Sequence, residues 1–263
     1  MDLELKGKRA LVTGASRGLG YATARRLALE GCHVALNSRS IKKLEPAVHT
    51  LAKETNTKLV SLPGDLSEST VPAELIQQTV DKLGGLDILV TNAGGPPPGS
   101  FETFDDTDWQ QAIELSLLSH VRLIRSALPH LRQSKVASVL TITSISVKQP
   151  IPNLVLSNSV RAATIGLTKT LALELGREGI RFNSILPTWT ETERVYELME
   201  ARTKLSGTTV EDELRAQADS SPLGRMGTPE EFGNAAVFLV SPVASYITGV
   251  MLPFDGGMYK GTF

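Results

Sequence analysis

Short apolar runs alternate with amphipathic stretches along most of the chain. About seven of these runs are rich in Val, Ile and Leu, which is typical of strands buried on both faces. They lie at residues 9–13, 33–37, 58–62, 86–90, 138–142, 180–186 and 249–252. Because helical stretches separate them, the pattern predicts an α/β fold, a doubly wound parallel sheet of about seven strands with helices on both faces.

Helical periodicity is clearest in two long stretches. Apolar residues recur every three or four positions from 107 to 131 and again from 156 to 175, as on one face of a helix. Thr107 and Gln110 predict a capping box at the start of the first stretch. A further helix is expected at Thr228-Pro229-Glu230-Glu231, which combines an N-cap, a proline at the first helical position and a capping glutamate.

The chain contains no low-complexity linker and no internal repeat, so we expect one domain over residues 1–263. A polar, helix-prone segment from about 191 to 221 interrupts the alternation, and connections of this length are commonly functional covers. We interpret this segment as a cover over a substrate site. The apolar inner wall expected of it consists of Tyr196, Leu198, Met199 and Leu205.

Composition narrows the classes of function. The chain has 263 residues, with 27 Lys and Arg against 28 Asp and Glu, and this balance argues against a nucleic-acid-binding surface. A single cysteine, Cys32, and scattered histidines give neither an internal disulfide nor the spacing of a metal site, so we expect no metal. No apolar run reaches the roughly 18 residues of a membrane span, and the N-terminus lacks a signal-peptide layout. We therefore expect a cytoplasmic protein with neither a nucleic acid nor a membrane as partner.

A glycine-rich turn joins the first predicted strand to the first predicted helix. It reads Thr13-Gly14-Ala15-Ser16-Arg17-Gly18-Leu19-Gly20. Its glycines let the backbone approach a pyrophosphate closely, and the helix that follows offers free N–H groups and the positive end of its dipole. A tight turn without a ligand is the alternative, but the strand–turn–helix position favours a dinucleotide site. The residues predicted to contact the dinucleotide here are Gly14, Ser16, Arg17, Gly18, Leu19 and Gly20.

Four motifs together resemble the short-chain dehydrogenase/reductase family, in its 3-oxoacyl-acyl-carrier-protein-reductase-like branch. The first is the Gly-x-x-x-Gly-x-Gly spacing of the turn, and the second is Asn92-Ala93-Gly94 after the fourth predicted strand. The third is Asp65, with Leu66 beside it, which matches the family's adenine contact, and the fourth is the C-terminal stretch 246–257. The resemblance covers nearly the whole chain. It implies a Rossmann-type sheet, a dinucleotide cofactor and a homo-oligomer, either a dimer or a tetramer.

The end of the second predicted strand bears on the choice of dinucleotide. NAD-dependent enzymes place an acidic residue there, which binds the ribose hydroxyls. Here the region reads Asn37-Ser38-Arg39-Ser40, without an acid. Arg39, together with Arg17 from the glycine turn, suits a 2′-phosphate, because guanidinium groups donate paired hydrogen bonds to phosphate. Two solvated surface arginines are the alternative. We predict NADP(H) as the preferred cofactor, contacted by Ser38 and Arg39, with NAD(H) as the second choice.

The resemblance also implies a catalytic set of Asn, Ser, Tyr and Lys, of which this chain keeps one member. Ser144, after the fifth predicted strand, occupies the serine position, where the family polarises the substrate carbonyl. The Tyr-x-x-x-Lys positions hold Ser157 and Arg161, and the asparagine position holds Ser116. Ser144, Ser157 and Arg161 are the candidate catalytic residues, and Arg161 is also a predicted cofactor contact. Pro187-Thr188 stands beside the nicotinamide position, where the family usually has Pro-Gly.

Loss of the tyrosine leaves the source of a proton open. A phenol has a pKa near 10 that a neighbouring cation can lower, whereas a serine hydroxyl is a far weaker acid. Arg161 keeps a positive charge but is not equivalent to lysine at an exacting site. The alternative donors are Tyr196, Lys148, His120 and a water relayed through Ser144 and Ser157. Each side chain also has an interpretation without a chemical role. Tyr196 would pack within the cover, Lys148 would be a solvated loop residue, and His120 would make a contact between helices.

Three functions remain open. The favoured one is an NADP(H)-dependent oxidoreductase with an atypical proton donor, acting on a small carbonyl or alcohol. The second is a catalytically degenerate NADP(H)-binding pseudoenzyme that serves as a sensor or an assembly protein. The third, non-redox dehalogenation, ranks last, because family members with that activity keep the tyrosine and lose the dinucleotide turn.

Overall fold

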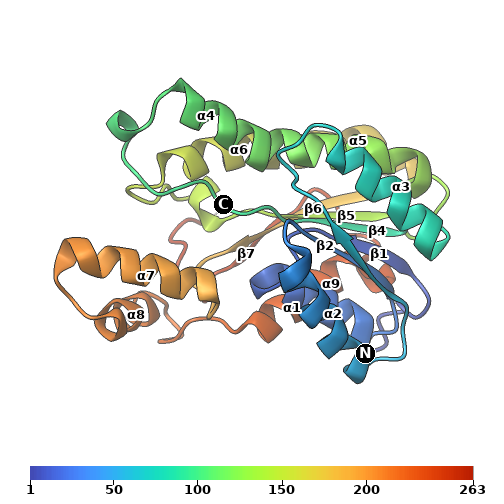
Figure 1. Ribbon diagram of the computed structural model, residues 1–263, viewed down its shortest axis with the longest axis horizontal. Coiled ribbons are helices and arrows are strands. Elements are labelled where there is room, and N and C mark those ends of the chain that lie inside the picture. Colours follow the sequence, from blue (N-terminus) through green and yellow to red (C-terminus); the bar gives the residue numbers. More distant parts are fainter. Residues whose placement is uncertain (263) are drawn as a thin grey trace.

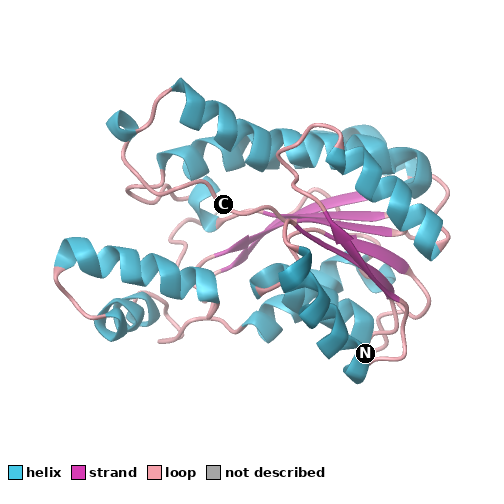
Figure 2. Cartoon of the chain, viewed as in Figure 1, coloured by secondary structure: helices cyan, strands magenta, loops and turns pink. Residues whose placement is uncertain are grey.

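The computed structural model describes residues 1–262, apart from the side chains of Lys204 and Leu205. The expected contribution of Leu205 to the cover therefore lies outside the described residues. The chain forms a seven-stranded parallel sheet in the order β3-β2-β1-β4-β5-β6-β7, which confirms the predicted fold class (Figures 1 and 2). The strands are Arg9–Val12 (β1), His33–Ser38 (β2), Leu59–Pro63 (β3), Ile88–Thr91 (β4), Ser138–Ile142 (β5), Arg181–Pro187 (β6) and Met251–Phe254 (β7).

Helices cover both faces of the sheet (Figure 1). One face carries α1 (Gly18–Leu29), α2 (Ile41–Glu54) and α9 (Pro229–Val240). The other carries α3 (Val71–Leu83), α5 (Ser119–Leu131) and α6 (Val155–Leu175), with α4 (Asp106–Ile113) leading into α5. The predicted cover segment forms α7 (Glu193–Ser206) and α8 (Val210–Asp219), which stand beyond the end of the sheet in Figure 1. No helix within the described part of the chain has the length and apolarity needed to cross a membrane.

Alternation along the strands builds two apolar cores. Along β1, Ala10 and Val12 pack into the core beneath α1 and α9, whereas Leu11 packs into the core beneath α3 and α5. All three side chains are fully buried. A strand covered on both faces has no solvent side, which explains why the sequence shows continuous apolar runs rather than alternating ones.

The helix starts show where local motifs compete. The capping box predicted at Thr228 and Glu231 is present at the start of α9, with Pro229 at the first helical position. The capping box predicted at Thr107 and Gln110 was wrong, because α4 begins two residues earlier and is capped by Asp105. The Asp105 carboxylate accepts hydrogen bonds from the backbone N–H groups of Thr107 and Asp108. A carboxylate at this position also interacts favourably with the helix dipole, which a threonine hydroxyl does less well.

A buried ion pair joins the starts of β1 and β4. Arg9 donates to both carboxylate oxygens of Asp87, at 2.8 and 2.9 Å, and Ser134 donates to the same carboxylate at 2.6 Å. Burial opposes ionisation of Asp87, but these hydrogen bonds outweigh it and hold the pKa of Asp87 below its ordinary value. The ionised carboxylate therefore stabilises the fold.

Replacing Asp87 by asparagine is expected to lower the free energy of unfolding by about 2 kcal/mol at neutral pH. Because the folded-state pKa is depressed, this contribution is fully present above the unfolded pKa of about 4 and is lost as the pH falls through the folded value. Urea unfolding of both proteins at several pH values measures the difference. A difference that does not shrink on acidification would contradict the assignment to the ionised carboxylate.

Candidate active site

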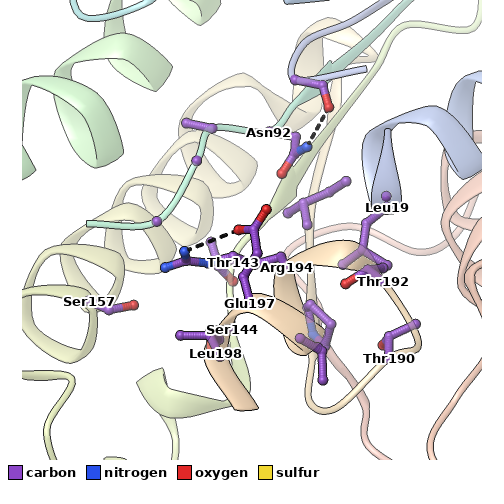
Figure 3. A pocket seen from close by; sticks show the side chains of 18 of the residues that line it. Leu19, Asn92, Thr143, Ser144, Ser157, Thr190, Thr192, Arg194, Glu197 and Leu198 are labelled. Atoms are coloured by element: carbon purple, nitrogen blue, oxygen red, sulfur yellow. Dashed lines mark hydrogen bonds and ion pairs between the residues drawn. The ribbon is translucent and has the colours of Figure 1, made fainter. Parts of the chain in front are cut away.

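The glycine turn and the end of β4 meet at the centre of the sheet. The strand order reverses between β1 and β4, and open α/β sheets bind ligands at such a point, beyond the carboxyl ends of the strands. Thr13 Oγ1 donates to the Asn92 carbonyl oxygen at 2.8 Å and accepts from the Asn92 backbone N–H at 2.9 Å. Asn92 Nδ2 donates to the Gly14 carbonyl oxygen, drawn as a dashed line in Figure 3. Asn92 thus holds the glycine turn in place.

This turn is closed too tightly for side chains. A Cβ atom on Gly14 would lie 2.7 Å from Asn92 Nδ2, and the residue has a φ of +58°. A Cβ atom on Gly20 would overlap the Gly14 carbonyl oxygen and lie 2.8 Å from Asn92 Nδ2. Both positions therefore need glycine, for the close approach of α1 to β4 and for the left-handed backbone at Gly14.

A cavity of about 790 Å³ begins at this turn and extends to α6 and the cover. Its size suits a bound organic ligand of cofactor dimensions. Gly20 packs behind the cavity wall, and the other residues predicted to bind the cofactor or to act in catalysis all line the cavity. These are Gly14, Ser16, Arg17, Gly18, Leu19, Ser38, Arg39, Asp65, Leu66, Asn92, Ala93, Gly94, Ser144, Ser157, Arg161, Pro187 and Thr188.

One end of the cavity matches the predicted adenine and ribose site. Asp65 accepts hydrogen bonds from the backbone N–H and the hydroxyl of Ser67, which fixes its carboxylate. Arg39 is exposed at this end, and Lys43 of α2 also lines the cavity. Sequence reasoning missed Lys43, which lies in the first turn of α2, three residues after the N-cap Ser40. These two cations, with no acidic residue between positions 38 and 43, fit a phosphate on the ribose.

Arg17 has a different partner from the one expected. It donates to Glu197 of α7 at 2.9 Å, and both side chains are nearly half exposed. This pair connects the glycine turn to the cover. The contact uses Nη1 of Arg17, and a guanidinium has five N–H donors, so other donors are left for a 2′-phosphate. No local sequence pattern predicts this contact, because the two residues are 180 positions apart.

Ser144 is oriented by the backbone that follows it. It has extended φ and ψ angles and caps the short helical turn Ile145–Val147. Its Oγ accepts a hydrogen bond from the Ser146 backbone N–H at 3.1 Å. Because that lone pair is taken by the backbone, the hydroxyl hydrogen can point into the cavity and donate to a substrate oxygen.

Arg161 and Ser157 form a pair one helical turn apart on α6. Arg161 Nε donates to Ser157 Oγ at 3.2 Å, and Nη1 lies 3.4 Å from the carbonyl oxygens of Ile142 and Thr143. The Arg161 residue is only 8% exposed. Burial, together with the charge of Arg194, lowers the pKa of Arg161 to about 10. Arg161 is therefore charged at neutral pH and acts as a hydrogen-bond donor, not as a proton source.

Ser116, which occupies the asparagine position of the family, does not line the cavity. Ser116 lies in a five-residue π-helical segment, Glu114–Leu118, between α4 and α5. Its hydroxyl is buried without a hydrogen-bond partner, and its carbonyl oxygen accepts from Thr164 Oγ1 at 2.7 Å. Short π segments often occur at functional sites. Here, however, the Ser116 carbonyl oxygen already accepts the hydrogen bond from Thr164.

The side chains weighed as proton donors do not line the cavity. His120 is buried and its Nδ1 lies 2.7 Å from Thr91 Oγ1. Burial and the charge of Arg161 lower the pKa of His120 to about 3, so it is neutral at physiological pH. Tyr196 is 46% exposed, and Lys148 lies over the ring of Tyr259 at 5.0 Å. Tyr259, which sequence reasoning missed, does line the cavity from the C-terminal segment.

The two residues predicted to lie beside the nicotinamide stand where β6 ends. Pro187 is buried as the last residue of β6, and the Thr188 backbone N–H donates to the Phe254 carbonyl oxygen of the neighbouring strand at 3.0 Å. Thr188 Oγ1 lies 3.4 Å from the same carbonyl oxygen. The threonine is thus accommodated without distorting the strand end. Thr188 lines the cavity together with Ser144 and Asn92.

The sheet order, the glycine turn and the cavity at the strand ends define a dinucleotide-binding protein of the Rossmann type. A family model described as enoyl-(acyl carrier protein) reductase matches residues 14–259. The chain belongs to the short-chain dehydrogenase/reductase family.

Individual relatives agree over the full length. The chain is 30% identical to the 3-oxoacyl-[acyl-carrier-protein] reductase FabG of Staphylococcus epidermidis, over 96% of this chain and 99% of that protein. It is 28% identical to the NADPH-dependent reductase BacG of Bacillus subtilis, over 96% and 98% of the two chains. The crystal structure of L-sorbose reductase from Gluconobacter frateurii, complexed with NADPH and L-sorbose, superposes with a TM-score of 0.95. It shares 32% identity and covers 99% of this chain and 100% of its own.

Proposed function

We propose that this protein is an NADP(H)-dependent oxidoreductase that reduces a small carbonyl compound, or oxidises the matching alcohol, with an atypical proton donor. One observation carries the proposal. A single cavity joins the glycine turn and the Arg39–Lys43 cations at one end to Ser144 and Arg161 at the other. The NADPH named for BacG and for the L-sorbose reductase complex supports the choice of cofactor.

The residues around the cavity fit a dinucleotide. Gly14 and Gly20 let the turn pack closely against Asn92, and the first turn of α1 presents backbone N–H groups to a pyrophosphate. Arg39 and Lys43 suit a 2′-phosphate, and Arg161 suits the hydroxyls of the nicotinamide ribose. An NADP(H) held by these residues would provide the hydride for carbonyl reduction.

The chain's own residues orient and polarise the substrate. Ser144 donates its hydroxyl hydrogen to the carbonyl oxygen, where negative charge develops as the hydride arrives. Arg161 holds the Ser157 hydroxyl beside it, and its buried charge favours the developing oxyanion. The proton then reaches the oxygen from water through the Ser144 and Ser157 hydroxyls, because neither serine nor arginine is acidic enough to supply it alone. We propose that α7 and α8 act as the cover that limits other water.

Cofactor titration tests the proposal. NADPH is expected to bind about a hundredfold more tightly than NADH, since the 2′-phosphate adds charge-assisted hydrogen bonds. Nicotinamide fluorescence measures both affinities on the purified protein. Replacing Arg39 by alanine is expected to cost about tenfold in NADPH affinity and to leave NADH affinity unchanged. Equal affinities for the two cofactors, or no binding of either, would refute the assigned nucleotide site.

A second candidate is a catalytically degenerate NADP(H)-binding pseudoenzyme, a sensor or an assembly protein. The replacements at Ser157 and Arg161 favour it, because they remove the phenol and the amine that the family uses. The double variant Ser157→Tyr, Arg161→Lys separates the two functions in an NADPH-oxidation assay with a panel of ketones and aldehydes. Turnover in the variant alone would favour the pseudoenzyme, whereas comparable turnover in both proteins would favour the oxidoreductase.

The proposal includes a homo-oligomeric, cytoplasmic protein. The resemblance to the short-chain dehydrogenase/reductase family, which implies a dimer or a tetramer, supports a contact between copies of the chain. A dimer or a tetramer built on such a contact would follow closed symmetry. Its mass is measurable by light scattering.

A further inference from the structure

The substrate end of the cavity holds a buried cation without a counter-charge. Arg161 is 8% exposed, and its partners are the Ser157 hydroxyl and two backbone carbonyl oxygens. No ion pair among the described residues includes it. Its Nη2 lies toward the Gly94–Gly95 loop, since a Cβ atom on Gly95 would be 3.7 Å from it. A buried charge is costly unless an opposite charge compensates it.

A second guanidinium approaches the same place from the cover. Figure 3 shows the Arg194 side chain extending from α7 into the cavity, with its ion pair to Glu197 as a dashed line. Arg194 and Arg161 both line the cavity, and the charge of Arg194 lowers the pKa of Arg161 in addition to burial. Repulsion between these two like charges destabilises the cavity as long as no anion lies between them.

The carboxylate closest to Arg194 does not cancel this cost. Glu197 lies 2.9 Å from Arg17 but 3.7 Å from Arg194, so its stronger interaction is with the glycine turn. Arg202, a third cation of the lining, lies 5.0 Å over the Trp189 ring, which does not neutralise it. Glu193 of α7 also lines the cavity, so Arg161, Arg194 and Arg202 stand against one carboxylate that is not paired with Arg17, and the substrate end carries a net positive charge. Trp189 and Leu198 give it an aromatic and apolar wall.

We infer that the substrate carries an anionic group, a carboxylate or a phosphate, which binds between Arg161 and Arg194. The inference rests on the proposed function, because it names the substrate class of that site. A guanidinium pair suits such a group, since planar donors match its oxygens. The carbonyl to be reduced then lies beside Ser144, and the anionic end points toward the cover. Arg194, which reaches the site from α7 of the cover, is the residue that gives the site its specificity for an anionic substrate.

Binding of matched ligand pairs tests the inference. The probes are short 2-oxo and 3-oxo carboxylic acids against their methyl esters, and phosphorylated hydroxyketones against the unphosphorylated compounds. Calorimetry on the protein, with and without NADP⁺, gives the affinities independently of turnover. One of the anionic classes is expected to bind about tenfold or more tightly than its neutral partner, and the class that does so identifies the anion.

Two variants assign the preference to the cavity. Arg194→Met is expected to remove most of the anion preference and to leave binding of the neutral compound unchanged, while Arg194→Lys keeps part of it. Arg215→Met is the matched control, because Arg215 is an exposed arginine of the same cover, on α8 and outside the cavity lining. It should behave as the wild type.

The outcomes separate this inference from the proposed function. If NADPH binds and the neutral compounds bind as well as the anions, the anionic substrate is wrong and the oxidoreductase stands. If the anion preference survives Arg194→Met, the assigned site is wrong. If NADPH does not bind, the proposed function is wrong. The affinities for the anionic and neutral probes then still show whether the site prefers an anionic ligand.

Discussion

Replacing Ser144 by alanine is expected to lower kcat/KM for carbonyl reduction by about a hundredfold or more, because it removes the donor that faces the developing oxyanion. The Ser144 hydroxyl is held in place by the Ser146 backbone N–H, so its loss also removes this one capping hydrogen bond of the turn Ile145–Val147. With the phenol absent at position 157, the remaining hydroxyl carries more of the polarisation than it would in a complete catalytic set. NADPH oxidation with the best substrate of a ketone and aldehyde panel measures the effect.

A neighbouring serine offers a matched control. Ser146 lies two residues further on, and its buried hydroxyl has no hydrogen-bond partner and does not line the cavity. Ser146→Ala deletes the same atom nearby and should leave kcat/KM unchanged, while NADPH affinity should be equal in all three proteins. Turnover of Ser144→Ala within a factor of about three of the wild type would contradict the assigned role, since one such donor is usually worth far more.

The second large effect is expected from Gly20→Ala. A Cβ atom there would overlap the Gly14 carbonyl oxygen and press on Asn92 Nδ2, and both belong to rigid parts of the turn. Forcing them apart should cost about 2–3 kcal/mol, which corresponds to about a hundredfold in NADPH affinity if the turn opens. Nicotinamide fluorescence measures the affinity, and thermal unfolding shows how much of the cost the fold bears.

Gly166→Ala is the control for this substitution. Gly166 lies within α6, and an added Cβ atom would meet nothing within 4 Å. Alanine is the better helix former by about 1 kcal/mol, so this variant should be as stable as the wild type or more stable, with unchanged NADPH affinity. Unchanged affinity in Gly20→Ala as well would mean that the turn relaxes freely and that its close packing is not needed for the cofactor.

The sequence predicted the fold well because the responsible signals are local or periodic. Each observed strand begins and ends within two residues of its predicted bounds, since burial on both faces leaves a continuous apolar run. The start of α9 was also predicted correctly, because its N-cap, proline and capping glutamate all lie within one helical turn. The start of α4 was misassigned, because Asp105 and Thr107 are both acceptable caps and only their relative energies decide between them.

The candidate site was predictable only where residues follow strand ends. Ser144, Asn92 and the glycine turn each follow a strand, and parallel strands bring their carboxyl ends to one edge of the sheet. Lys43 and Tyr259 were missed because their places at the cavity depend on the packing of α2 and of the C-terminal segment. His120 was weighed as a proton donor because it shares a helix face with Ser116, but its contact with Thr91 draws it into the interior.

The sequence by itself determined the order of strands and helices, the need for glycine in the first turn and the loss of the tyrosine and lysine at 157 and 161. These depend on the identity of residues and on short-range geometry. Only the tertiary structure decided that Arg17 binds Glu197, that Thr164 occupies the Ser116 carbonyl, and that Arg194 enters the cavity beside Arg161. Such contacts join distant parts of the chain, and their energies depend on burial and charge at positions that folding alone brings together.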